Sequence, residues 1–338
     1  MTSPSAAPAP IFADTAVPVI DISPYFSGDP AQKRAVARQI DEACRAIGFL
    51  VISGHGVPTE LIERAGRLAR AFFDLPLSVK MKYVADNRGY APMFASALAY
   101  TIGDDASPPD FRELLTVGQH SIDEADPYFS SPEGRRVFPP NVYPDEIAGL
   151  RETLDAYYDA MTELATALMR LFALALDLDE HWFDDKIDKH MTNLCLSNYP
   201  DQPDGAAQEQ LRAGAHTDWG SLTILKAEDK PGGLEVRTAA GAWEPAPVVP
   251  GAFIINIGDL MAQWTNDQWV STMHRVVNPP PDKAVGSRRQ SLIFFHQPNY
   301  DALVECLASC VGQGAKYAPT TSGEHLRMKM EMSRVASA

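Results

Sequence analysis

The sequence predicts an α+β protein whose second half forms a mainly β core of the sandwich, jelly-roll or barrel type. Three observations lead to this prediction. The first eighty residues alternate between strand-like and helix-like segments. A long amphipathic pattern near the middle of the chain predicts a buried helix. Beyond Lys189, short β-like runs are separated by Gly, Pro and Asp, which is typical of these architectures rather than of alternating βα units.

In the first half, the predicted elements follow one another closely. Residues 17–22 predict a short strand, and residues 29–47 predict an amphipathic helix with apolar side chains at helical spacing. Residues 48–53 predict a buried strand. Turn residues follow, and Thr59 is the expected N-cap of a second helix that runs to Phe73.

The remaining segments between and after these elements are less uniform. Residues 87–144 contain several Pro and Gly residues without a clear period, so we expect an irregular stretch there, and loops of that length are usually functional or mobile. Residues 144–178 predict the long helix. Residues 301–338 predict a short helix, which carries Cys306 and Cys310 as packing residues, then a loop and a Met-rich polar helix.

Five β-like runs define the expected core, and they set the predicted division of the chain. The runs are residues 194–197, 221–226, 234–237, 252–257 and 291–296. The expected regions are a disordered tail (1–16), an N-terminal region packed on the core (17–120), a loop and long helix (121–190), the core (191–300) and a C-terminal helical segment (301–338).

Composition limits the class of protein. The chain has 338 residues, of which 45% are hydrophobic and 22% charged, as in globular proteins. Its net charge of −15 argues against nucleic acid or an anionic membrane surface as a partner and favours a small molecule or a protein. There is no apolar run of membrane-spanning length, no signal-peptide pattern and no disulfide-like cysteine spacing. We therefore expect a cytoplasmic protein.

One short motif, His216-Thr217-Asp218, offers two metal ligands. In an extended segment, side chains two positions apart lie on one face, so His216 and Asp218 can reach one ion. With 8 His and 44 acidic residues in the chain, about one such pair arises by chance. The pair gains weight from His274, which lies in a β-like segment later in the core. Two imidazoles and one carboxylate form the facial triad of non-haem Fe(II) oxygenases, which leaves coordination positions open for a keto acid and dioxygen.

A receptor for a carboxylate follows the triad in the chain. Arg289 and Ser291 share a face if their segment is a strand, and a guanidinium beside a hydroxyl binds a carboxylate well. Such a contact contributes about 1.5 to 3 kcal/mol. The neighbouring Arg288 is an alternative, but the period of two favours Arg289.

The same motifs resemble a known family. They are His216-x-Asp218, His274 and Arg289-x-Ser291, with Asn198-Tyr199-Pro200 upstream, and Val17-Pro18-Val19-Ile20-Asp21, Gly48-Phe49 and Gly54-His55-Gly56-Val57 near the start. In this order they resemble the isopenicillin N synthase-like group of Fe(II)/2-oxoglutarate dioxygenases over nearly the whole chain. The resemblance implies a double-stranded β-helix, or jelly roll, with flanking helices.

The resemblance also implies a site. Fe(II) would be held by His216, Asp218 and His274. 2-Oxoglutarate would chelate the iron and place its far carboxylate on Arg289 and Ser291, where Tyr199 matches a family residue that adds a hydrogen bond. With O2 as the other co-substrate, such enzymes release succinate and CO2 while they oxidise a small organic substrate, often in secondary metabolism. Hydroxylation is the commonest outcome, and desaturation and ring closure also occur.

Several alternatives remain open from the sequence. An isopenicillin N synthase-like oxidase or an ethylene-forming enzyme would share the triad, a binding protein on the same fold would lack catalysis, and two His with one Asp also suit a zinc hydrolase. His55 and His296 are interpreted as structural. The residues that we expect to line the substrate pocket are Trp219, Phe295, Tyr90, Arg88 and Phe111.

Overall fold

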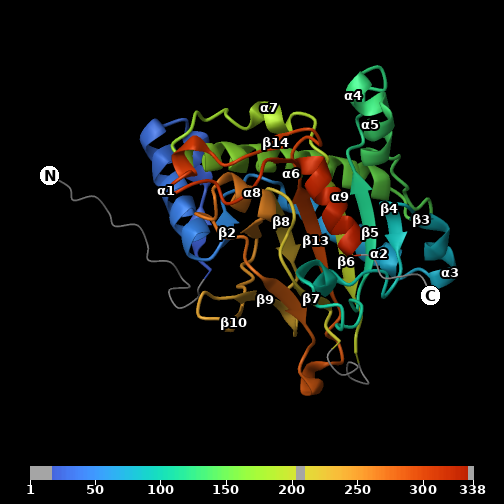
Figure 1. Cartoon of the computed structure of the whole chain (residues 1–338). Helices are drawn as coiled ribbons and strands as arrows, with labels where there is room; N and C mark the ends of the chain where they lie inside the picture. The colour runs from blue at the N-terminus through green and yellow to red at the C-terminus, as the bar shows by residue number, and fades with distance from the viewer. Residues whose placement is uncertain (1–16, 203–209, 334–338) are drawn as a thin grey trace.

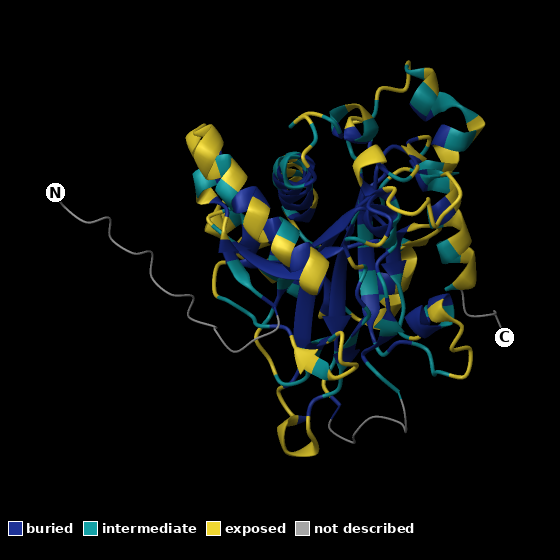
Figure 2. Cartoon of the chain, turned by 60° about the vertical axis from the view of Figure 1, so that its left-hand side comes forward, coloured by how far each residue is buried: buried dark blue, intermediate teal, exposed yellow. Residues whose placement is uncertain are grey.

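The structure is a computed structural model of the chain, and it describes residues 17–202 and 210–333. The expected disordered tail, residues 1–16, lies outside the described residues. In the described part, two β-sheets and a layer of helices are stacked (Figure 1). The strands at the centre are mostly buried, whereas the surface helices alternate between buried and exposed residues (Figure 2). None of the described helices is long and apolar enough to cross a membrane.

The larger sheet has nine strands in the order β1-β2-β11-β8-β13-β6-β5-β4-β3. All neighbouring strands are antiparallel except the β1–β2 pair, which is parallel. The strands are β1 (Val19–Asp21), β2 (Phe49–Ser53), β3 (Val84–Ala85), β4 (Arg88–Ala91), β5 (Glu113–Gly118), β6 (Asn193–Tyr199), β8 (Leu222–Ala227), β11 (Phe253–Ile257) and β13 (Arg289–His296).

The smaller sheet has four antiparallel strands in the order β10-β9-β12-β7. It packs face to face on the larger sheet, since Leu234 and Val236 of one contact Leu225, Ile254 and Ile293 of the other in one apolar cluster. The strands are β7 (Ala213–His216), β9 (Gly233–Arg237), β10 (Trp243–Pro245) and β12 (His274–Val277), and a separate pair is formed by β14 (Leu303–Val304) and β15 (Thr320–Thr321).

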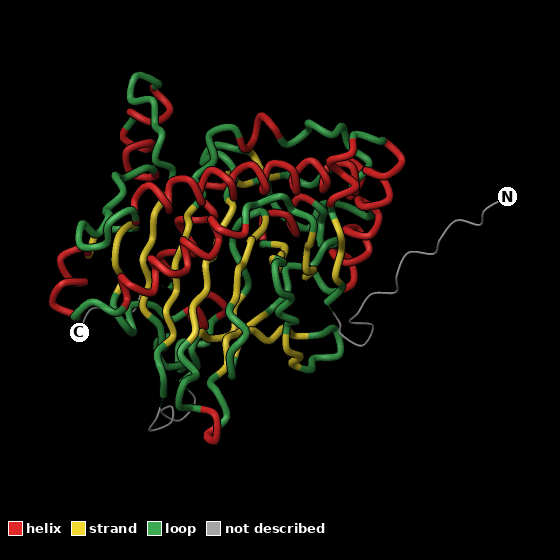
Figure 3. The backbone as a smooth tube through the Cα atoms, turned by 180° about the vertical axis from the view of Figure 1, so that it is seen from behind, coloured by secondary structure: helices red, strands yellow, loops and turns green. Residues whose placement is uncertain are grey.

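Helices cover the other face of the larger sheet. The longest, α6, runs across its strands (Figure 3), with a stripe of apolar side chains buried against them. The helices of the described chain, on this face and elsewhere, are α1 (Pro30–Ala46), α2 (Thr59–Phe73), α3 (Leu77–Lys80), α4 (Pro127–Ser130), α5 (Pro132–Val137), α6 (Leu150–Ala175), α7 (Asp184–Ile187), α8 (Asp259–Trp264) and α9 (Ser322–Met332). The short 3-10 helices are η1 (Ser23–Ser27), η2 (Met81–Tyr83), η3 (Leu98–Ile102), η4 (Pro281–Lys283) and η5 (Ala308–Cys310).

Alternation along the strands separates the two cores. In β2, Leu50 and Ile52 pack against the helices, whereas Phe49 and Val51 pack between the sheets. The residue before this strand must be Gly, because Gly48 has a φ of +65° and an added Cβ would lie 1.8 Å from the carbonyl oxygen of Val270.

Most predicted elements are confirmed with small shifts, but four expectations are wrong. The stretch 87–144 is not irregular throughout, since it contains β4 and β5. The long helix begins at Leu150, after Gly149 in the left-handed region, rather than at residue 144. Pro58, not Thr59, holds the N-cap position of α2. The expected helix around Cys306 and Cys310 is only the 3-10 turn η5.

Candidate metal centre

The side chains of His216, Asp218 and His274 meet at one end of the smaller sheet. His216 ends β7, and its cross-strand partner His274 begins β12. One ligand atom from each of the three residues lies within 4.8 Å of the other two. The Oδ1 atom of Asp218 is 3.8 Å from Nε2 of His216 and 3.7 Å from Nε2 of His274. The structure therefore brings together the three residues that the sequence selected as metal ligands.

Backbone carbonyl groups orient both imidazole rings. Nδ1 of His216 is 2.7 Å from the carbonyl oxygen of Gly214, and Nδ1 of His274 is 3.1 Å from that of Thr272. Because a carbonyl oxygen only accepts, each Nδ1 carries the proton and each Nε2 keeps a lone pair for a metal. Burial and the adjacent His274 ring hold the pKa of His216 well below its usual value, so this ring is neutral near pH 7.

The carboxylate of Asp218 is oriented in the same manner. Its Oδ2 atom accepts hydrogen bonds from Thr223 Oγ1 at 2.5 Å and from Asn256 Nδ2 at 2.7 Å. These bonds leave Oδ1 directed toward the two histidines. The triad thus presents two nitrogen atoms and one oxygen atom in a buried position, a donor set that fits Fe(II) and leaves its other coordination positions open.

A small cavity beside the triad contains a buried arginine that forms no ion pair with any described acidic side chain. Arg289 is 2% exposed, and its one hydrogen bond to a described residue goes from Nη2 to the backbone oxygen of Glu228 at 3.3 Å. The Glu228 carboxylate is bound by Arg70 instead, at 2.6 Å. Ser291 and Tyr199 line the same cavity, and the Tyr199 ring centre is 5.5 Å from the guanidinium carbon. Burial lowers the pKa of Arg289 from its usual range.

The adjacent arginine points elsewhere. Arg288 donates from Nε to Asn198 Oδ1 at 2.9 Å and forms an ion pair with Asp74. It does not line the small cavity. Alternation along β13 therefore gives this pair of arginines different environments, and Arg289 is the one that faces the triad's cavity.

A second, larger cavity of about 310 Å³ also borders the triad. His216, Asp218, Arg112 and Phe295 line both cavities, so the triad lies where they meet. Of the residues expected in the substrate pocket, three line the larger cavity. They are Arg88, Trp219 and Phe295.

Tyr90 and Phe111 do not line the larger cavity. Tyr90 belongs to the core on the helix side of the sheet, where its hydroxyl donates to Glu113 Oε2 at 2.6 Å. Phe111 packs on Phe94, with ring centres 5.7 Å apart. The placement of Tyr90 is set by the helices behind the sheet, which the local sequence does not reveal.

The two histidines interpreted as structural have polar partners of their own. His55 Nε2 is 2.7 Å from the carbonyl oxygen of Gly251, and His296 Nδ1 is 2.7 Å from Ser221 Oγ. Within residues 17–202 and 210–333, the triad is the one group of three or more His, Cys, Asp or Glu side chains close enough to hold a metal ion.

Comparison with known families agrees with this geometry. Residues 17–146 match the family described as non-haem dioxygenase in morphine synthesis, N-terminal, and residues 190–298 match the 2OG-Fe(II) oxygenase superfamily. A 2-oxoglutarate-Fe(II) type oxidoreductase, hxnY of Emericella nidulans, is 35% identical over 93% of this chain and 89% of its own length. The chain belongs to the 2OG-Fe(II) oxygenase superfamily. The expected double-stranded β-helix and the use of Fe(II), 2-oxoglutarate and O2 are thereby confirmed.

Two further relatives of this oxygenase are associated with different small molecules, one by its name and one by its crystal structure. Validamycin A dioxygenase of Streptomyces hygroscopicus is 31% identical over 93% of this chain and 85% of its own length. A full-length Neurospora crassa protein, whose crystal structure contains α-KG and thymine, is 28% identical, with a TM-score of 0.80 over 94% of this chain and 96% of that one. The shared fold therefore serves unlike small molecules.

Sequence reasoning missed several residues of the oxygenase site. Arg112 lines both cavities and pairs with Asp110 at 3.2 Å, while Asp110 also accepts from the backbone of Gly214 at 2.9 Å. The only signal for Arg112 is the strand alternation that follows it, which the many Pro and Gly residues of the stretch 87–144 obscure. Leu326 and Met330 of α9 also line the larger cavity, and nothing local in the sequence places this helix there.

Proposed function

We propose that His216, Asp218 and His274 hold the Fe(II) of this oxygenase and that Arg289 and Ser291 bind the far carboxylate of 2-oxoglutarate. The support is chemical: three oriented donor atoms converge, and the buried guanidinium beside them has no acidic partner in the part of the chain that the structure describes. A guanidinium in such a place costs stability unless an anion joins it. When bound, the iron and the keto acid together supply the activation of dioxygen.

The small cavity has the features that a dicarboxylate needs. Ser291 and Tyr199 offer hydroxyl groups beside Arg289, and apolar side chains such as Leu225, Leu234 and Ile293 close the remaining wall. Because water is largely excluded, the bond between Arg289 and a carboxylate is strengthened. A contact of this type contributes about 1.5 to 3 kcal/mol, which favours a dicarboxylate over a monoacid.

The larger cavity takes the primary substrate in this proposal. Its volume of about 310 Å³ limits the substrate to a small organic molecule, and Trp219 and Phe295 give it aromatic walls next to the triad. Hydroxylation of this molecule is the reaction that we propose. The single observation that carries the proposal is the meeting of both cavities at His216 and Asp218.

The experiment compares two adjacent arginines. Anaerobic addition of Fe(II) and then 2-oxoglutarate should produce a weak visible absorption band in the wild type and none in His216→Ala. Under air, Arg289→Ala should raise the 2-oxoglutarate concentration needed for succinate release by roughly 10-fold or more. Arg288→Ala is the matched control and should leave this concentration unchanged. Equal behaviour of the two variants would remove Arg289 from the proposed site.

The proposal extends to cellular context and to the division of the chain. All four cysteines are free, which supports a reducing, cytoplasmic setting. A role in secondary metabolism is supported by the small molecule named for the Streptomyces relative. We also propose residues 191–300 as the catalytic core, since the proposed iron and 2-oxoglutarate residues all fall within it.

A further inference from the structure

A second buried arginine, Arg88 at the start of β4, lies at the larger cavity and has no acidic partner within residues 17–202 and 210–333. Arg88 is 4% exposed, and its one hydrogen bond to a described residue runs from Nη1 to the backbone oxygen of Asn87 at 2.7 Å. Its Nε atom has no hydrogen-bond partner in the same part of the chain. Arg88 forms none of the ion pairs found among the described residues, although most arginines nearby do.

The space for this guanidinium is provided by Gly118 of β5. A Cβ at Gly118 would lie 2.2 Å from Nη2 of Arg88, so any other residue there would displace the side chain. Asn141 holds Gly118 in place, since it accepts from the Gly118 nitrogen at 2.7 Å and donates to its carbonyl oxygen at 2.8 Å. The position of Arg88 is therefore built into the sheet rather than left to a surface rotamer.

The groups around Arg88 do not neutralise its charge. The ionisable side chains that act on its charge are Tyr143, Tyr158 and Cys195, and because burial raises the pKa of each, all three are neutral near pH 7. Two acids, Glu133 and Glu331, line an adjoining cavity with Arg88, but they are paired with Arg136 and Arg327. In the cavity itself, Arg112 is paired with Asp110, and Asp218 is a proposed iron ligand. The cavity thus has an unneutralised positive charge at Arg88.

Other polar atoms in the same wall also lack partners. Among the described residues, Trp219 Nε1, Asn193 Oδ1 and Gln297 Oε1 have no hydrogen-bond partner, and all three residues line this cavity. Buried polar groups in proteins are nearly always hydrogen-bonded, and of these three atoms only the Trp219 donor could serve an anion. The remaining wall is apolar, with Leu98 and Leu114 among its residues.

From these contacts we infer that the primary substrate is a small organic carboxylate whose acid group binds Arg88. This inference rests on the proposed function, because it places the oxidised carbon between Arg88 and the triad in the shared cavity. A planar guanidinium matches a carboxylate through two parallel hydrogen bonds, and burial strengthens both. The volume of about 310 Å³ leaves room for a compact apolar or aromatic body on that acid.

The test uses matched acids and amides as probes. Protein loaded anaerobically with Fe(II) and 2-oxoglutarate is titrated by calorimetry with benzoate, phenylacetate and 3-phenylpropanoate, and with the corresponding amides. At least one acid should bind roughly 10-fold or more tightly than its amide, the preference expected of one charge-assisted contact. Arg88→Met should abolish this preference. Arg88→Lys keeps the charge but lacks the two parallel N–H donors of the guanidinium, so it should weaken the preference.

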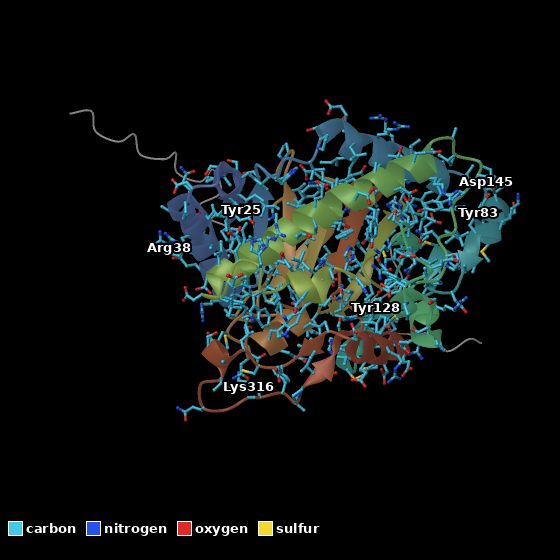
Figure 4. The ribbon with its side chains drawn as sticks, turned by 90° about the horizontal axis from the view of Figure 1, so that it is seen from above. Tyr25, Arg38, Tyr83, Tyr128, Asp145 and Lys316 are labelled. Carbon is cyan, nitrogen blue, oxygen red and sulfur yellow. The ribbon has the colours of Figure 1, made fainter. Side chains whose placement is uncertain are left out.

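The control variant is Arg38→Met, an exposed arginine on α1 at the edge of the molecule (Figure 4), which should bind like the wild type. Melting temperatures show that the variants are folded. Absence of the visible band before any probe is added would refute the proposed iron and 2-oxoglutarate site. A normal band with no acid bound, with equal affinity for acid and amide, or with the preference retained in Arg88→Met would overturn the carboxylate inference alone.

Discussion

At the scale of single residues, the site depends on side chains that hydrogen-bond to the proposed iron-binding residues and do not themselves contact the metal. Thr223 and Asn256 bind one oxygen of Asp218 and so decide which oxygen faces the histidines. Such supporting hydrogen bonds fix the ligand geometry and its basicity. Their loss should be visible in metal affinity before it is visible in the fold.

Thr223→Val removes one of these bonds with little change in volume. We expect the affinity for Co(II), measured by its visible absorption, to fall roughly 10- to 100-fold. Thr166→Val on α6, where the hydroxyl bonds only the carbonyl of Thr162, is the control and should keep wild-type affinity. Unchanged affinity in Thr223→Val would show that Asn256 alone positions the carboxylate.

A buried histidine should make the metal-free protein acid-sensitive. Burial lowers the pKa of His190 to about 4, whereas it is near 6.5 in the unfolded chain. Between these values the unfolded state binds a proton that the folded state does not, so stability falls as pH decreases. From pH 7.5 to 5 this residue should cost about 2 kcal/mol. In urea unfolding, the free energy of unfolding of His190→Phe should depend on pH by about that much less than the wild type. The same pH dependence in both proteins would show that His190 does not cause it.

At the scale of elements, β5 separates two environments. Arg112, Leu114 and Thr116 line the larger cavity, while the carboxylate of Glu113 turns the other way. There it accepts from Lys80 Nζ at 2.7 Å and from Asn198 Nδ2 at 2.8 Å, all in buried positions. This network fixes which face of β5 points toward the helices and therefore which side chains form the wall of the larger cavity.

Glu113→Ala would leave Lys80 buried without its partner. We expect the free energy of unfolding to fall by about 3 to 5 kcal/mol, measured with urea. The exposed pair of Glu133 and Arg136 provides the comparison, and Glu133→Ala should cost less than about 1 kcal/mol. A loss in Glu113→Ala no larger than in the surface variant would show that the network does not hold β5.

The elements also show what the sequence could predict. Short apolar runs, such as β2 and β8, and the spacing of His216, Asp218 and His274 are local patterns, and the structure agrees with them. Which face of a strand borders a cavity is not local. Tyr90 faces the helix layer because α2 packs behind it, and its ring contacts Phe72 of that helix.

At the scale of the whole molecule, ligands should stabilise the fold by mass action. Mn(II), which does not support turnover, is added first, and 2-oxoglutarate is added second. At about 100 times its dissociation constant, 2-oxoglutarate should raise the free energy of unfolding by about 2.7 kcal/mol. The melting temperature should therefore rise in two steps. Arg289→Ala should keep the Mn(II) step and lose most of the second, while Arg288→Ala should keep both. Loss of the Mn(II) step in Arg289→Ala would indicate a disturbed fold instead.

The position of β7 has a consequence for iron-free protein. β7 is an edge strand of the smaller sheet, and its last residue, His216, is paired across the ladder with His274. An ion bound by both residues would act as a crosslink between β7 and β12. Without it, the ladder to β12 and the bond of Gly214 to Asp110 hold β7, so this edge strand should open more readily. Amide hydrogen exchange in residues 213–216 should accordingly slow when Mn(II) is added, while exchange in β9 should not change.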